Sequence, residues 1–146
     1  MLINDGDTVC IVGGGPGGSA CAMALLSEAR RVGRKIDVVL FEHKKFSEHR
    51  HYNQCIGVLS PPFEDILKNE LGLVLPDHLV LNDMEGYRLH SDLLSLDLIG
   101  EESGRSVSVT RSKFDAFMLE EAQKAGAQVV HDRVTSVEVN HGGVLV

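Results

Sequence analysis

The sequence predicts an α/β fold in which crossover helices join the strands of a parallel sheet. A short apolar strand over residues 9–12 runs into a glycine-rich turn over residues 13–18. A helix rich in Ala, Leu and Met follows over residues 19–32 and stops at Gly33, and a second apolar strand over residues 35–42 ends in an acid. Strand, glycine turn, helix and strand in this order are typical of a Rossmann-like unit that binds a dinucleotide.

The glycine turn has the spacing Gly-x-Gly-x-x-Gly at Gly13, Gly15 and Gly18. In such a turn the first glycine allows the tight bend, the second lets the backbone approach phosphate groups, and the third lets the helix pack closely on the sheet. The helix that begins around Pro16 offers unpaired N–H groups and the positive end of its dipole to a pyrophosphate. The alternative is a structural turn without a ligand.

Glu42 supplies the second half of this pattern. It lies 24 residues after Gly18, close to the spacing of roughly 20 residues at which an acid binds the ribose 2′-hydroxyl of a dinucleotide. Its charge would repel a 2′-phosphate, so an NADP-type ligand is disfavoured there. The alternative is an ordinary charge at the end of a strand.

Composition narrows the class of protein. The chain has 146 residues, of which 43% are hydrophobic and 24% are charged, and this suits one globular domain over residues 1–146. A formal net charge of −7 argues against binding of nucleic acid, which requires an excess of Lys and Arg. No apolar run approaches the roughly 20 residues of a membrane span, and Asp5 and Asp7 stand where a signal peptide is basic. We therefore expect a cytoplasmic protein.

The cysteines do not form a Cys-x-x-Cys pair, so neither a disulfide framework nor a zinc ribbon is predicted. Cys10 and Cys21 are expected to be small buried hydrophobic residues. Cys55 differs because it follows a polar, irregular segment that contains His49 and His51. These three side chains could ligate a metal, but no further ligand stands at a recognisable spacing, and no metal site is predicted.

The middle of the chain predicts a helix and an antiparallel insertion. Residues 63–71 have helical apolar spacing, with Ser60 as the expected N-cap and a proline in the first turn. Short alternating or apolar runs over residues 86–89, 93–98 and 106–109 are expected to be antiparallel strands.

A third helix opens at residues 112–115 and stops at Gly126, with an apolar face at helical spacing. Residues 128–131 should return as a parallel strand beside the first strand. Residues 133–139 and 144–146 should form a hairpin around residues 140–143. Because the sequence stops within the second arm of this hairpin, we expect the front portion of a longer protein.

Four motifs occur in an order that resembles a known family. They are Gly-Gly-Gly-Pro-Gly-Gly-Ser at residues 13–19, the acid Glu42, Cys-Ile-Gly-Val-Leu-Ser-Pro at residues 55–61 and Arg-Ser-Lys-Phe-Asp at residues 111–115. The chain resembles the FAD-dependent oxidoreductases of the geranylgeranyl reductase group, whose FAD domain is similar to that of p-hydroxybenzoate hydroxylase. The likeness spans nearly all of the chain. It departs from the family at residues 55–58, where the group has Cys-Gly-Gly-Gly or Cys-Gly-Glu-Gly.

The resemblance implies a set of residues that bind FAD. Arg111 would reach the phosphate and ribityl region, and the backbone of Val134, at the start of a strand, would lie near the adenine. Cys55 would pass near the flavin and is the one catalytic candidate; other catalytic residues are not predicted. The whole expected set for the cofactor is Gly13, Gly15, Pro16, Gly17, Gly18, Glu42, His43, Arg111 and Val134.

The implied function is the FAD-binding portion of a flavin-dependent oxidoreductase. The enzyme would reduce an isoprenoid-like or other small organic substrate, or act as a monooxygenase such as an aromatic hydroxylase, or as a halogenase, with NAD(P)H as electron donor. Two alternatives stay open: a nucleotide-binding module without turnover, and an NAD-dependent dehydrogenase domain. The sequence does not predict the substrate or the oligomeric state.

Overall fold

The computed structural model describes residues 3–46, 55–99, 104–140 and 142–146. The chain divides into two compact units, one formed by Met1–Tyr52 with Phe114–Val146 and the other by Asn53–Lys113. The strands predicted as an antiparallel insertion all belong to the second unit. His49 and His51 lie outside the described residues, so the structure does not bear on them.

The first unit contains a parallel sheet of three strands. β1 (Thr8–Val12) pairs with β2 (Asp37–Phe41), and β2 pairs with β8 (Gln128–Val130), so the strand order is β1-β2-β8. The parallel arrangement was predicted, but the expected place of β8 beside the first strand is wrong. β2 is the central strand, and its side chains are the most buried of the sheet, with Val38 at 2% and Leu40 at 0% exposure.

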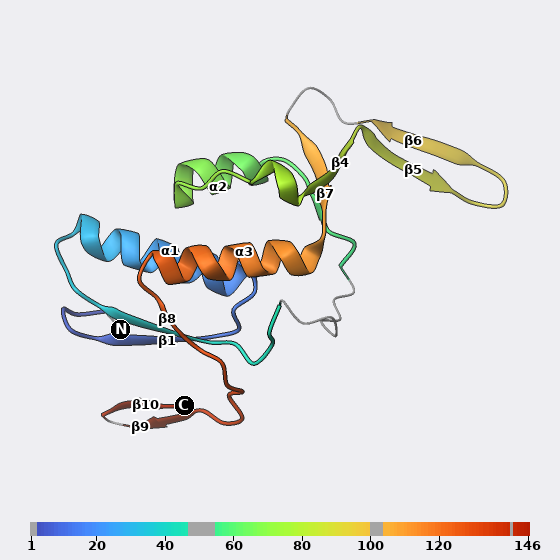
Figure 1. Cartoon of the computed structure of the whole chain (residues 1–146). Helices are drawn as coiled ribbons and strands as arrows, with labels where there is room; N and C mark the ends of the chain where they lie inside the picture. The colour runs from blue at the N-terminus through green and yellow to red at the C-terminus, as the bar shows by residue number, and fades with distance from the viewer. Residues whose placement is uncertain (1–2, 47–54, 100–103, 141) are drawn as a thin grey trace. The chain divides into compact units, whose positions relative to one another are not determined.

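Two helices cover one face of this sheet (Figure 1). α1 (Pro16–Arg31) buries Ala22, Met23 and Leu26, and Gly33 follows it with a φ of +70°. α3 (Arg111–Lys124), which enters this unit at Phe114, buries Met118 and other side chains of its predicted apolar face. Both helices have nearly the predicted bounds, because apolar spacing and terminal glycines identify them locally.

The rest of the first unit differs from the sequence predictions in the hairpin and in the exposure of two cysteines. β9 (Glu138–Asn140) and β10 (Gly143–Leu145) form the predicted antiparallel hairpin, but its first arm is shorter than expected, and Val134 is not in a strand. Cys10 and Cys21 are exposed instead of buried. Side chains alternate along a strand, and Cys10 shares its exposed face of β1 with Val12.

The second unit contains a small antiparallel sheet and a helix. β3 (Val58–Leu59) and β4 (Val80–Met84) flank the central strand β7 (Ser106–Val109). α2 (Phe63–Leu71) has the predicted bounds, and η1 (Asp77–Leu79) precedes β4. Ser60 is not the N-cap of α2: Pro62 holds that position, and Ser60 contributes its carbonyl to the N–H of Phe63.

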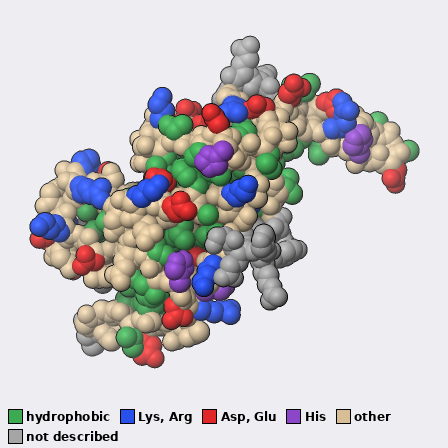
Figure 2. Space-filling view, in the orientation of Figure 1, with side chains coloured by type: hydrophobic (Ala, Val, Ile, Leu, Met, Phe, Trp, Pro, Cys, Tyr) green, Lys and Arg blue, Asp and Glu red, His purple; other side chains and the backbone are tan. Residues whose placement is uncertain are grey.

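A separate hairpin of the second unit is formed by β5 (Gly86–His90) and β6 (Ser95–Ile99). Arg88 and Asp97 face each other across it, and Figure 2 shows hydrophobic side chains at its free end. Leu93 and Leu94 at that end are 92% and 77% exposed. Among the helices in the described ranges, none has the length and apolar character needed to span a bilayer.

Candidate dinucleotide site

The glycine turn after β1 has the backbone geometry that its sequence predicts. Gly13 has a φ of +103°, a conformation that side chains disfavour, and its N–H donates to the carbonyl of Phe41 at 2.8 Å. A Cβ on Gly18 would stand 1.9 Å from the carbonyl oxygen of Gly13 and 3.3 Å from Cγ2 of Ile11. Gly18 therefore brings α1 against the turn and β1, as expected from the motif.

Hydrogen bonds hold the turn on both sides of Gly14. The N–H of Gly14 donates to Oε2 of Glu42 at 2.8 Å, and the hydroxyl of Ser19, which is fully buried, donates to the carbonyl of Gly14 at 3.0 Å. A Cβ on Gly14 would meet Cβ of Glu42 at 2.8 Å and Cδ1 of Leu119 at 3.0 Å. The motif predicts no role for Gly14 or Ser19. A glycine at position 14, where the motif allows any residue, is the one local sign of a close contact there.

The side of the turn in front of α1 is open. Built Cβ atoms on Gly15 and Gly17 would meet nothing within 4 Å, and the first turn of α1 contains no acid. The N–H groups of Gly17 and Gly18 lie in the first turn, where a helix offers no acceptor. These features fit an anion such as a pyrophosphate, because the donors are unpaired within the helix and the dipole favours negative charge.

Glu42 directly follows β2 and is buried, with 6% of the residue exposed. Its Oε1 accepts the N–H of Lys44 at 2.8 Å, while Oε2 accepts the N–H of Gly14. Nδ1 of His43 lies 3.4 Å from Oε1. A carboxylate oxygen can accept more than one hydrogen bond, so the two backbone donors fix the group and leave capacity for a ribose hydroxyl.

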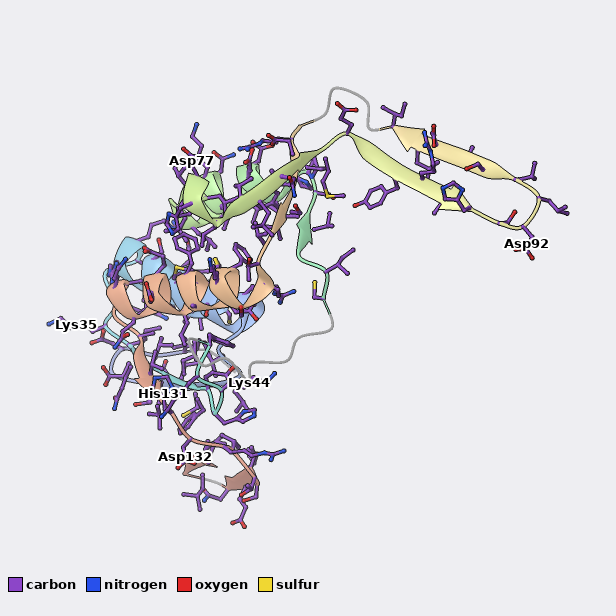
Figure 3. The ribbon with its side chains drawn as sticks, turned by 45° about the vertical axis from the view of Figure 1, so that its right-hand side comes forward. Lys35, Lys44, Asp77, Asp92, His131 and Asp132 are labelled. Carbon is purple, nitrogen blue, oxygen red and sulfur yellow. The ribbon has the colours of Figure 1, made fainter. Side chains whose placement is uncertain are left out.

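A cavity of about 350 Å³ lies beside Glu42, within the size range of small-molecule sites. It brings together four residues of the predicted set, which are Gly13, Glu42, His43 and Val134. Lys44, Asp132 and Arg133 also line it, and no sequence motif points to these three residues. Figure 3 labels Lys44 and Asp132, which line the cavity, and His131, which precedes Asp132 in the first unit.

Arg111 and Cys55 belong to the second unit, where one glycine links their segments. Gly57 has a φ of +77°, and a Cβ on it would stand 2.0 Å from the carbonyl oxygen of Val109 and 3.6 Å from the backbone nitrogen of Arg111. The N–H of Val109 donates to the carbonyl of Gly57 at 2.8 Å. The segment that follows Cys55 is thus held against the end of β7, next to the start of α3. In the part of the chain that the structure describes, no three His, Cys, Asp or Glu side chains are grouped to hold a metal.

The chain is similar in sequence to longer proteins, of which it spans only a part. No protein-family model matches the chain. Protein FixC of Escherichia coli (strain K12) is 30% identical over 130 residues, which are 82% of this chain and 27% of FixC. An uncharacterized protein in the nifH2 5′ region of Methanosarcina barkeri is 30% identical over 142 residues, covering 89% of this chain and 68% of that protein.

Solved structures of a reductase-like protein and of flavin-dependent enzymes share the fold. A geranylgeranyl bacteriochlorophyll reductase-like protein from Thermoplasma acidophilum is 27% identical, with a TM-score of 0.67, over 97% of this chain and 34% of that one. The flavin-dependent brominase Bmp2 is 22% identical with a TM-score of 0.68, over 97% of this chain and 33% of its own. A variant of halogenase PltM in complex with FAD is 18% identical with a TM-score of 0.65, over 97% of this chain and 30% of its own. The chain therefore belongs to the family of the uncharacterized M. barkeri protein, and it shares its fold with the geranylgeranyl reductase-like structure and with these flavin-dependent enzymes.

Proposed function

We propose that the chain binds FAD through a Rossmann-like first unit and serves as the FAD-binding portion of a flavin-dependent oxidoreductase. The observation that carries this proposal is the buried carboxylate of Glu42, which fixes the glycine turn through Gly14 and borders the cavity. The flavin-dependent relatives and the FAD complex of one of them support FAD as the dinucleotide.

The residues of the first unit would hold the ADP half of the cofactor. The open face of the turn at Gly15 and Gly17 receives the pyrophosphate, which the first N–H groups of α1 bind. Glu42 accepts a ribose hydroxyl, and the cavity bordered by His43 and Val134 receives the adenosine. The donors to the pyrophosphate are backbone N–H groups. Its negative charge is therefore stabilised by peptide dipoles whose directions are fixed by the helix.

The reaction class that we propose is supported by the flavin-dependent relatives. When bound, the flavin supplies the redox chemistry, and the protein orients it and controls access. A reductase of an isoprenoid-like substrate is supported by the geranylgeranyl reductase-like structure, and a halogenase or monooxygenase by the brominase. NAD(P)H is the proposed electron donor, and Arg111 and Cys55 remain the proposed contacts near the flavin.

Titration of the purified chain with FAD and ADP tests the proposal, with Glu42→Gln as the decisive variant. The amide of Gln offers one acceptor where the carboxylate has two, so one backbone N–H loses its partner. We expect binding of both ligands to weaken about tenfold or more, the size of a charge-assisted hydrogen bond. Glu28→Gln is the matched control, because Glu28 is exposed on α1 and pairs with Arg31 at 2.6 Å on the surface; it should bind both ligands like the wild type.

A ligand-side measurement separates the ribose contact from an effect on folding. The wild-type chain should bind 2′-deoxy-ADP more weakly than ADP, and this difference should be smaller in Glu42→Gln. Binding of ADP without FAD would replace the flavoprotein proposal by a nucleotide-binding module. A wild-type chain that binds neither ligand would refute both.

A further inference from the structure

The hydrogen-bond ladder between β2 and β8 ends beside the cavity, where one backbone bond of the ladder is missing. Phe41 is paired with Val130, and the N–H of Glu42 still donates to the carbonyl of Val130 at 3.0 Å. The N–H of Asp132 donates to the same carbonyl of Val130, at 3.0 Å, so its partner lies two residues earlier in the chain and not in β2. In a continuing parallel ladder that N–H would go across to the carbonyl of Glu42.

The ring of His131 takes the place of the lost ladder bond. Its Nδ1 lies 3.3 Å from the carbonyl oxygen of Glu42, and the contact is partly buried. A carbonyl oxygen can only accept, so Nδ1 must carry a proton. The structure thus predicts the Nδ1–H form of the ring, with Nδ1 as the donor to this carbonyl.

We propose that His131 is a positioning residue for the adenosine cavity, an inference that rests on the proposed binding of the ADP half. The carbonyl of Glu42 belongs to the peptide between Glu42 and His43. In the chain, this peptide lies between the Glu42 side chain, whose Oε2 accepts the N–H of Gly14, and the N–H of Lys44, which donates to Oε1 of the same side chain. By fixing the peptide plane, His131 fixes the direction in which the Glu42 carboxylate leaves the backbone.

Neighbouring charged groups do not replace this contact. His43 is half exposed, and its Nδ1 faces the carboxylate of Glu42, not the peptide carbonyl. Lys44, Asp132 and Arg133 line the cavity, and the carboxylate of Asp132 accepts the N–H of Arg133 at 2.7 Å. The structure therefore gives His131 a role distinct from that of the charged cavity wall.

The first test is the tautomer of His131 in the wild-type chain without ligand, measured from nitrogen-15 chemical shifts of the imidazole. The inference requires the proton on Nδ1, although a free neutral imidazole ring in water favours Nε2. A neutral His131 with a bare Nδ1 would overturn it. This measurement involves no substitution, so a variant that fails to fold cannot obscure the result.

The second test compares two substitutions by titration with ADP. His131→Leu removes the donor and should weaken ADP binding about threefold to tenfold, the effect of one neutral hydrogen bond. His131→Asn carries its amide nitrogen on Cγ, where His carries Nδ1, and should bind within about twofold of wild type if it restores that bond. His90→Leu is the matched control, because Nδ1 of His90 pairs with Ser95 in the β5–β6 hairpin at 2.8 Å, and it should leave ADP binding unchanged.

The outcomes separate this inference from the proposed function. Protonated Nδ1, weakened binding in His131→Leu and rescue by His131→Asn support the positioning role. Equal ADP affinity in His131→Leu and the wild type overturns that role and leaves the proposed function standing. A wild-type chain that binds neither FAD nor ADP refutes the proposed function and, with it, the positioning role, whatever the tautomer.

Discussion

At Gly14, one residue connects three parts of the first unit. Its N–H reaches Glu42 at the end of β2, its carbonyl receives the hydroxyl of Ser19 on α1, and the space of its missing side chain is taken partly by Leu119 of α3. The residues of the predicted turn were recognisable because their spacing is local. The contact of Gly14 with Glu42 was not, because it joins residues 28 positions apart.

Two neighbouring glycines of α1 should respond differently to alanine. Gly18→Ala places a Cβ 1.9 Å from a backbone carbonyl, so the turn must open, and we expect the free energy of unfolding to fall by about 1–3 kcal/mol. Gly17→Ala meets nothing within 4 Å, and its higher helix propensity should leave stability unchanged or raise it by up to about 1 kcal/mol. Urea denaturation of both variants measures the difference. Equal destabilisation would show that the close contact at Gly18 does not limit the turn.

At the scale of elements, local patterns predicted helices better than strand partners. α1, α2 and α3 have nearly the expected bounds, because apolar spacing and stop glycines lie within each segment. The partner of β8 depends on which strand is central, and the three residues of β8 are too few for a pattern that would show it. β3 contains two residues, too few to show alternation, and β4 has a register irregularity between Val80 and Asn82 that interrupts its pattern.

The β5–β6 hairpin contains a cross-strand ion pair with a testable acid response. Nη2 of Arg88 donates to Oδ2 of Asp97 at 2.8 Å, and this bond lowers the pKa of the Asp97 carboxyl. A carboxyl whose pKa is lower in the folded hairpin stabilises it above the unfolded pKa of about 3.9, and this contribution is lost as the pH falls through the lower folded pKa. Carboxyl chemical shifts of Asp97, followed by NMR from neutral to acidic pH, measure this shift. In Arg88→Gln the pKa should return toward its usual value; the same titration in both proteins would contradict the assignment.

At the scale of the whole chain, the predicted site residues are divided between the two units. The turn, Glu42, His43 and Val134 belong to the first, and Arg111 and Cys55 to the second. The dinucleotide motif accounts for the turn and Glu42, because its spacing reflects a single strand–helix–strand unit. Val134, Arg111 and Cys55 were expected only from family resemblance, since no periodicity or spacing connects them to the motif.

Amide hydrogen exchange of the full chain tests how ADP binding is distributed along it. ADP should slow exchange at residues 14–19 and at Lys44, which lie in the turn, at the start of α1 and on the cavity wall. Exchange in the β5–β6 hairpin should stay as it is without nucleotide. Protection of the hairpin with none at the turn would place the nucleotide elsewhere and contradict the proposed site.

The hydrogen bonds around Gly14 also have a consequence for the thermodynamics of binding. Ordering the backbone of one flexible residue costs about 1–2 kcal/mol in conformational entropy, and a loop that orders on binding subtracts this from its affinity. Glu42 and Ser19 already hold the turn in the free chain, so a nucleotide meets a backbone that has lost this freedom during folding. Little of the intrinsic affinity of the turn is then lost to ordering, and the entropy change of association is dominated by released water and by the ligand itself.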